Sequence, residues 1–236
     1  MVIDTALGAC LSGVFEVSAT EVAARGLRHE LMTKGHQERL GGMVRDAVGD
    51  AARDGGGGFE KIDRIGVTVG PGSFTGLRVG LAFAQGLGTS LDRPVIGLST
   101  LDGLAISIRP NGLVAAVVDA RRGQVYIRLF RDARPITEAQ ALSLEDATDL
   151  IFSHAGADKP LLVGSGGPVL RDAAPERYEA ALIAPFPAPS PEGLAFMTAM
   201  ADPERCPATP LYLRAPDATP PTRLPGQPRQ PTSEAG

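Results

Sequence analysis

The sequence predicts an α/β protein made of two similar lobes, each of which opens with a β-hairpin. Three observations support this fold class. An apolar segment with the pattern of a hairpin occurs twice, at residues 2–15 and 117–130. Short apolar strands alternate with amphipathic helices between and after these segments. With 236 residues, of which 43% are hydrophobic and 21% charged, the chain is long enough to bury the core of one large or two small domains.

The repeated segment is the main clue to the architecture. Residues 2–15 spell VIDTALGACLSGVF and residues 117–130 spell VVDARRGQVYIRLF, so each copy is a strand, a turn with glycine and a second strand. A shift of 115 residues matches Asp4 with Asp119, Gly8 with Gly123 and Phe15 with Phe130. Chance similarity is the alternative explanation for three identities. Two lobes that each begin with a hairpin holding an Asp near its turn are typical of the actin-like ATPase fold, also called ASKHA.

The first lobe is predicted over residues 1–108. Its first helix is predicted over 38–52, where apolar residues recur at helical spacing and a glycine run follows. The later elements, in chain order, are a strand at 65–69, a glycine-rich loop at 70–76, a helix over 76–91 and a strand at 95–99. Ser99 with Asp102 then forms a capping box that predicts another helix.

The second lobe is predicted over residues 109–214. After the repeated hairpin, the expected elements are a helix near 144–152 capped by Ser143, a strand at 161–165 and a helix that starts at Ser190-Pro191. Six of the last 22 residues are proline and almost none is large and apolar. Residues 215–236 are therefore predicted to be a disordered tail.

Composition narrows the function. The formal net charge is −4, and no basic run appears, which argues against a chain that grips nucleic acid alone. Cys10 and Cys206 fit no metal or redox spacing. Asp4 lies where a signal peptide would be apolar, and no apolar run approaches the ~20 residues that cross a bilayer. We expect a cytoplasmic protein that is not attached to a membrane.

Residues 66–88, GVTVGPGSFTGLRVGLAFAQGLG, closely resemble the signature of the TsaB (YeaZ) family. Similar segments occur in order along the chain: IDTALGAC at 3–10, HQERL at 36–40, VIGLSTLDGLA at 95–105, VVDARRGQVY at 117–126 and PLYLR at 210–214. The resemblance implies two actin-like lobes and a part in making N6-threonylcarbamoyladenosine in tRNA. TsaB-type proteins pair there with the catalytic protein TsaD, assisted by the ATPase TsaE. It also implies contact with tRNA only through the complex, and a homodimer as an alternative assembly.

The glycine-rich loop has two interpretations. Its position between a strand and a helix suits a phosphate loop, because amides at a helix N-terminus favour anions. A G-x-G-x-x-G match would need Gly in place of Thr75, and no Lys follows Gly76 to complete a Walker motif. We favour a structural turn whose helix is capped by Ser73 or Thr75. The signature residues are Gly70, Pro71, Gly72, Ser73, Phe74, Thr75, Gly76 and Arg78.

Asp4 and Asp119 occupy the positions of the Mg-ATP carboxylates of actin-like kinases, which makes an ATP-dependent enzyme the main rival hypothesis. Such enzymes usually place Gly soon after the first Asp, whereas Thr5 and Ala6 follow Asp4 here. We interpret Asp4, Thr5 and Asp119 as a vestigial nucleotide cleft. No cofactor of its own is expected, and binding of ATP or ADP at an interface with the partner is left open.

A metalloenzyme or glycoprotease-like peptidase is the third hypothesis. Catalytic relatives of this fold carry an H-x-x-x-H pair that places two imidazoles on one helix face. The only histidines are His29, His36 and His154, and none is followed by another at that spacing. We therefore expect neither a metal site nor catalytic residues, and kinship of fold does not establish activity.

The helix over 76–91 is the best candidate for binding a partner. Its apolar and small residues cover an arc much wider than the ~100° that one sheet requires. We expect Leu77, Leu81 and Leu91 to face the sheet. The alternative is a helix buried wholly inside its own lobe. The predicted partner-binding residues, on this helix and the helix over 38–52, are Leu40, Met43, Val44, Ala47, Gly76, Val79, Gly80, Phe83 and Leu87.

Overall fold

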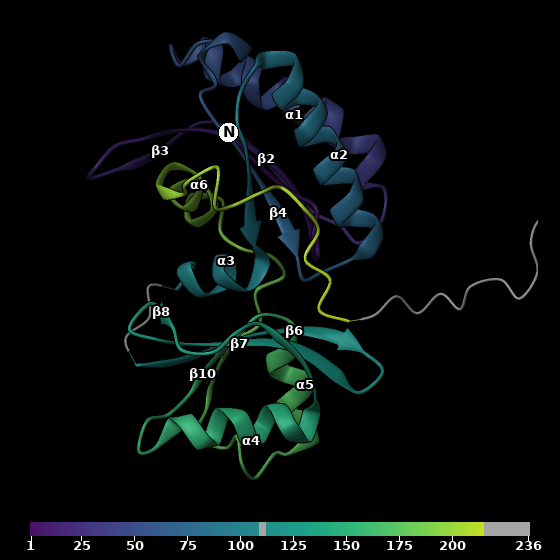
Figure 1. The fold of residues 1–236 in the computed structure, drawn as a ribbon, viewed down its shortest axis with the longest axis vertical. Coiled ribbons are helices and arrows are strands. Elements are labelled where there is room, and N and C mark those ends of the chain that lie inside the picture. The colour runs from purple at the N-terminus through teal and green to yellow at the C-terminus, as the bar shows by residue number, and fades with distance from the viewer. Residues whose placement is uncertain (109–111, 215–236) are drawn as a thin grey trace, which may run out of the picture.

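A computed structural model of the protein describes residues 1–108 and 112–214, which form two β-sheets with helices packed on them (Figure 1). The first sheet has the strand order β3-β2-β1-β4-β5. Its strands are β1 (Val2–Asp4), β2 (Ala9–Val17), β3 (Val22–Leu31), β4 (Ile65–Gly70) and β5 (Val95–Ser99). The strand β2 is antiparallel to both β1 and β3, whereas β4 and β5 run parallel to β1.

The second sheet repeats this arrangement, with the order β11-β10-β6-β7-β8 and with β9 also paired to β7. Its strands are β6 (Leu113–Arg121), β7 (Gln124–Arg131), β8 (Arg134–Pro135), β9 (Gln140–Ser143), β10 (Leu161–Val163) and β11 (Leu182–Ala184). The hairpin β6–β7 corresponds to β1–β2, and β10 and β11 run parallel to β6 as β4 and β5 do to β1. The predicted α/β fold with two hairpin-led sheets is confirmed.

Helices cover both sheets and fill the space between them (Figure 1). On the first sheet, α1 (His36–Arg53) and α2 (Phe74–Leu91) pack on one face and α6 (Pro191–Met200) on the other. The helix α3 (Thr100–Ile106) lies between the sheets, while α4 (Leu144–Ala155) and α5 (Gly166–Ala173) cover the far face of the second. A short 3₁₀ helix, η1 (Phe59–Lys61), precedes β4.

The strand β6 contributes side chains to two hydrophobic cores, one on each of its faces. Leu113, Ala115 and Val117 belong to the cluster with α4 and α5, whereas the intervening Val114, Ala116 and Val118 pack with α3. Successive side chains of a strand point to opposite faces, so a continuous apolar run is buried on both.

Local signals located the helix starts well. Ser99, Ser143 and Ser190 are the N-caps of α3, α4 and α6, as predicted, and their hydroxyls accept hydrogen bonds from the backbone three residues later. The helix predicted from residue 76 begins at Phe74, because Ser73 is its N-cap and accepts from the Gly76 amide at 3.2 Å. The sequence did not predict β3, β8, β9, β11, α5 or η1, which are short or carry no clear alternation.

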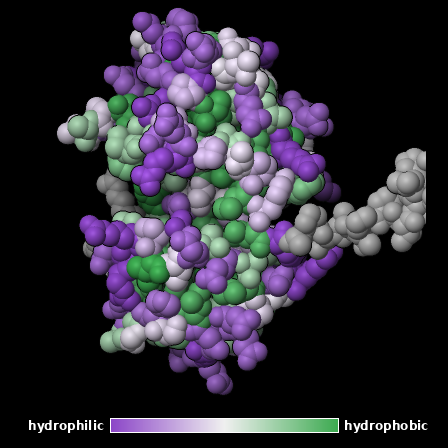
Figure 2. All heavy atoms as spheres, in the orientation of Figure 1, coloured by the Kyte–Doolittle hydropathy of each residue, from purple (hydrophilic) through white to green (hydrophobic). Residues whose placement is uncertain are grey.

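The predicted division at residue 108 stays a prediction. The helix α3, which belongs to the predicted first lobe, packs on β6 of the second sheet. The helix α6, which belongs to the predicted second lobe, packs on the first sheet. The tail predicted over 215–236 lies outside the described residues. In the two described ranges, no helix has the length and apolar content needed to cross a membrane. Hydrophilic residues cover the far ends of the molecule, and hydrophobic ones show nearer its middle (Figure 2).

Candidate functional site

The signature loop at 70–76 packs directly on the segment that follows β1. The Ser73 amide donates to the Ala6 carbonyl at 2.7 Å, and the Thr5 hydroxyl donates to the Gly76 carbonyl at 2.7 Å. A Cβ on Gly72 would lie 2.3 Å from the Ala6 oxygen, and one on Gly76 would lie 2.1 Å from the Thr5 oxygen. Glycine is required here because two backbone segments approach more closely than a side chain permits. This geometry supports the interpretation of the loop as a structural turn.

Amides that a phosphate would need are already bonded within the chain. The Ala6 amide donates to Asp4 Oδ1 at 2.9 Å, and the Gly8 amide donates to the Pro187 carbonyl at 3.0 Å. The Ser73 amide is bonded to Ala6 as described above. Phosphate loops bind anions through amides that point outward without partners. Three amides of the two loops are therefore already paired within the chain, and only the Ser73 amide is paired by the contact between the loops.

The Asp4 carboxyl is fully buried beneath these loops. Its Oδ1 accepts hydrogen bonds from the Thr68 hydroxyl at 2.6 Å and from Ala6, whereas its Oδ2 has no partner. Burial raises the pKa of Asp4 above its usual value, and the hydrogen bonds from Thr68 and Ala6 oppose that rise. An acid in this position favours its neutral form more than in water, which suits a structural role better than binding a hydrated cation.

Asp119, the counterpart of Asp4 in the second sheet, is partly exposed. Its Oδ1 accepts from the Arg121 amide at 2.8 Å, and its Oδ2 lies 3.2 Å from the Arg121 guanidinium. Its own amide donates to the Ser165 hydroxyl at 3.2 Å. The two repeated aspartates therefore differ in environment, although each bonds to a backbone amide two residues later.

The histidines serve local structure. The buried His36 places Nε2 3.2 Å from the Ala9 carbonyl, and His154 places Nδ1 2.9 Å from the Leu150 carbonyl. Over residues 1–108 and 112–214, no three His, Cys, Asp or Glu side chains lie close enough together to hold a metal ion.

Six of the predicted partner-binding residues lie inside the first lobe, which corrects their assignment to a surface. Leu40, Met43, Val44 and Ala47 are at most 2% exposed and belong to the core beneath α1. Gly76 and Gly80 face Thr5, which follows β1, because a Cβ on Gly80 would lie 2.4 Å from Thr5 Oγ1. The small-residue ridge of α2 thus permits close packing on its own sheet. Helical spacing alone could not show whether this ridge packs on the chain's own sheet or on a partner.

The other predicted flank of α2 remains accessible. Val79, Phe83 and Leu87 are half-buried at the edge of the core, whereas Leu77 and Leu81 are buried against the sheet, as predicted. A Cβ on Gly41 of α1 would lie 3.8 Å from the Phe83 ring, so the two helices form one surface. We call Val79, Phe83, Leu87 and the exposed Gly41 and Gly86 the α1–α2 face.

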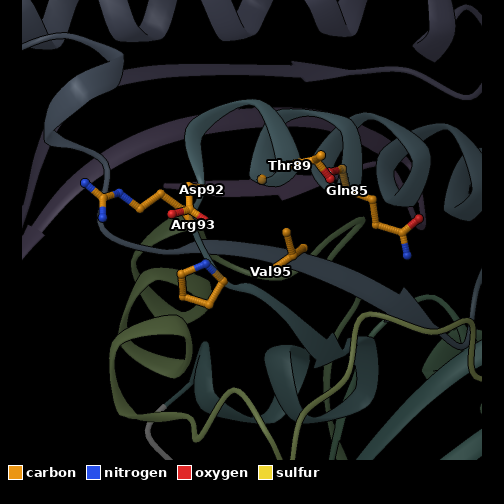
Figure 3. Close-up of a pocket in the computed structure, with 7 residues that line it drawn as sticks. Gln85, Thr89, Asp92, Arg93 and Val95 are labelled. Carbon is orange, nitrogen blue, oxygen red and sulfur yellow. The ribbon is translucent and has the colours of Figure 1, made fainter.

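Sequence analysis missed two surface features, one at each end of α2. A pocket of about 510 Å³ lies at the C-terminal end of α2, and Figure 3 shows Gln85 and Arg93 at its opposite ends. Gln85 Nε2 donates to the Ala208 carbonyl at 2.8 Å. Near the other end of α2, Tyr212 packs on Phe74 with ring centroids 5.6 Å apart. The resemblance of PLYLR to a family segment was the only signal that this region mattered.

Comparison with known proteins shows which family the chain resembles in sequence and in fold. Residues 13–198 match the model of the family described as TsaD, tRNA N6-adenosine threonylcarbamoyltransferase. A solved structure titled YeaZ from Pseudomonas aeruginosa aligns with 90% of this chain and 98% of its own, at a TM-score of 0.65 and 25% identity. The chain belongs to the TsaD/TsaB (YeaZ) family.

Named TsaB proteins and full-length relatives support the same assignment. TsaB of Bacillus subtilis, a tRNA threonylcarbamoyladenosine biosynthesis protein, is 44% identical over 108 residues, which is 44% of this chain and 46% of that protein. An uncharacterized protein of Mycobacterium tuberculosis is 33% identical over 223 residues, 93% of each chain. A second Pseudomonas aeruginosa structure, described as similar to peptidase YeaZ, covers 90% of this chain and 98% of its own, with TM-score 0.71 and 29% identity.

Proposed function

We propose that this chain is a non-catalytic subunit that pairs with a TsaD-type enzyme in the N6-threonylcarbamoyladenosine modification of tRNA. One observation carries the proposal: the loops at 4–8 and 70–76, the two segments weighed above as a phosphate site, are packed against each other too closely for a side chain to fit between them. The chain then contributes a binding surface, and the transfer of threonylcarbamoyl to tRNA belongs to the TsaD-type enzyme, assisted by a TsaE-type ATPase. The protein is cytoplasmic in this proposal and meets tRNA only within the complex.

The α1–α2 face is the proposed docking surface. It combines half-buried apolar side chains with exposed glycines, so a helix of another protein could approach closely. A second copy of this chain would use the same face, and homodimer and enzyme complex would then compete. ATP or ADP, where it is needed, would bind at the interface with the enzyme.

The ATP-dependent enzyme remains the main alternative, because the repeated aspartates occupy corresponding places near the C-terminal ends of β1 and β6. The buried Asp4 with its raised pKa weighs against it. The peptidase alternative has weaker support. Ser153 Oγ lies 3.1 Å from His154 Nδ1, but both atoms also contact the Leu150 carbonyl of the same exposed helix turn. That arrangement resembles helix capping more than nucleophile activation.

The test is reconstitution with the TsaD-type and TsaE-type proteins of the same cell, supplied with tRNA, ATP and threonylcarbamoyl-adenylate as the donor of the group. We expect the chain to co-elute with the TsaD-type enzyme, and modified adenosine to appear in tRNA digests only when both are present. The variants Asp4→Asn and Asp119→Asn should support modification as the parent does. ATP hydrolysis by the chain alone, abolished by Asp4→Asn, would instead establish the ATP-dependent enzyme.

A further inference from the structure

An exposed aromatic stack lies at the N-terminal end of α2. Phe74 and Tyr212 are 50% and 46% exposed, and they account for two of the three exposed aromatic residues in the described ranges. The Arg78 guanidinium lies 3.8 Å from the centroid of the Phe74 ring, and its Nε is 3.5 Å from the Tyr212 hydroxyl. Exposed rings are costly in water, so a stack that is held in place and left open indicates a binding surface.

Two arginines of the second sheet lie at the tip of a hairpin that the C-terminal segment links to this stack. Arg121 and Arg122 occupy the end of the β6–β7 hairpin, where both have positive φ values of 64° and 55°. Such positions favour glycine or asparagine, so two arginines there are unfavourable for the backbone. The Arg121 side chain is 86% exposed and bridges to Asp119. The hairpin therefore presents a cationic side chain to solvent at its tip.

The C-terminal segment brings the two groups together. Arg214 donates to the Ala120 carbonyl at 3.1 Å, and Tyr212, two residues earlier, packs on Phe74. Figure 1 shows this yellow segment passing from the first sheet to the β6–β7 hairpin. We name the resulting surface the arginine–aromatic patch; its residues are Phe74, Arg78, Arg121, Arg122, Tyr212 and Arg214. It concentrates four cations on a chain whose formal net charge is −4.

We propose that the arginine–aromatic patch binds a single-stranded segment of the tRNA substrate while the chain is assembled with its enzyme. The inference rests on the proposed function, which supplies the RNA. Unpaired bases stack on aromatic rings and on guanidinium planes, and arginines beside them bind phosphates. An acidic peptide would use the arginines but would gain little from two open rings. The overall acidity of the chain agrees with a contact made only within the complex.

The test titrates the assembled complex with an in vitro transcript of a tRNA that carries the target adenosine. Stacking losses of the usual size predict that Phe74→Ala and Tyr212→Ala each raise the Kd about fivefold or more. Arg121→Ala should reduce the slope of log K against log salt by about 0.7. The matched controls are Phe196→Ala, an exposed aromatic on α6, and Arg171→Ala on α5, whose side chain is 52% exposed. Both should bind the transcript as the parent does.

Assembly with the enzyme is measured for every variant by size-exclusion chromatography, and folding by thermal melting. Normal assembly with weakened RNA binding supports the inference. Unchanged Kd values for Phe74→Ala and Tyr212→Ala overturn it, and so does loss of the enzyme from these variants, which would make the patch a protein-docking surface. If the parent chain does not assemble with the enzyme, the proposed function fails. Because the inferred contact is made within the complex, that result overturns the inference together with the proposed function, whereas unchanged Kd values in an assembled complex overturn the inference alone.

Discussion

Replacing Gly86 with arginine tests the α1–α2 face without disturbing the helix that carries it. Gly86 lies three residues after Phe83 and seven after Val79, so it shares their side of α2. A Cβ built on Gly86 meets no heavy atom within 4 Å, and its φ lies outside the left-handed region. Gly86→Arg should therefore fit the isolated chain and obstruct any protein that packs closely there.

Gly86→Arg should raise the stability of the isolated chain and lower its affinity for the enzyme. Glycine inside a helix is less favourable than a good helix former such as arginine by about 0.5–1 kcal/mol. For a protein of this size, that gain corresponds to a Tm higher by about 1–4 °C. Helices that pack in contact have axes about 8–10 Å apart, which leaves no room for an arginine side chain between them. We expect association with the TsaD-type enzyme to weaken at least tenfold, or about 1.4 kcal/mol.

Melting of the isolated chain and titration with the labelled enzyme measure the two effects separately. Ser153→Arg is the control, because it adds the same charge at an exposed position of α4 on the other sheet. It should leave the affinity unchanged. A Gly86→Arg variant that binds the enzyme as tightly as the parent refutes the assignment of the face, and a Tm lowered by several degrees refutes the open environment of Gly86.

Four further variants test the structure around the site. Leu81→Glu places an unpaired charge at a position only 4% exposed and should unfold the chain. Phe83→Glu should melt nearly normally, and its affinity for the enzyme should fall at least tenfold. Circular dichroism melting and a pull-down with the enzyme distinguish the two results. The raised pKa of Asp4 contributes stability that is complete below the usual value of 3.8 and is lost as pH rises through the raised pKa. Asp4→Asn should therefore raise the Tm more at pH 8 than at pH 4, and the reverse order would contradict the burial argument. A chain ending at Cys206 loses the hydrogen bonds from Leu211 to Val69 and from Arg214 to Ala120. It should melt several degrees below a chain ending at Arg214, and equal Tm values would show that the segment contributes nothing.

The elements that the sequence located correctly are those with local signals. The N-cap serines Ser99, Ser143 and Ser190 bond to backbone only three residues away, so neighbours in sequence suffice to predict them. The strand at 95–99 and the hairpin at 117–130 follow from short apolar runs and a turn. The edge strand β3 was missed because alanine, glycine and arginine interrupt its alternation.

In the candidate site, too, the sequence predicted local features and missed contacts between distant segments. Helical spacing showed that Leu77 and Phe83 lie on different sides of α2, and the structure confirms which of the two is buried. Spacing could not show that Gly76 and Gly80 face Thr5, because that contact joins α2 to a segment about 70 residues earlier. It also assigned the apolar face of α1 to a partner, although the chain's own sheet covers it.

The sequence by itself determined the family signature, the two hairpin-led sheets and the wide apolar arc of α2. These features depend on residues within a helix turn or a hairpin of one another, where spacing fixes geometry. Only the tertiary structure decided which arc is covered, that the 4–8 and 70–76 loops fill each other's space, and that the C-terminal segment contacts both Arg78 and the β6–β7 hairpin. Arg78 and Arg121 are far apart in the sequence, and the C-terminal segment links them through Tyr212 and Arg214. Such contacts depend on the closure of long loops, which spacing along the sequence does not report.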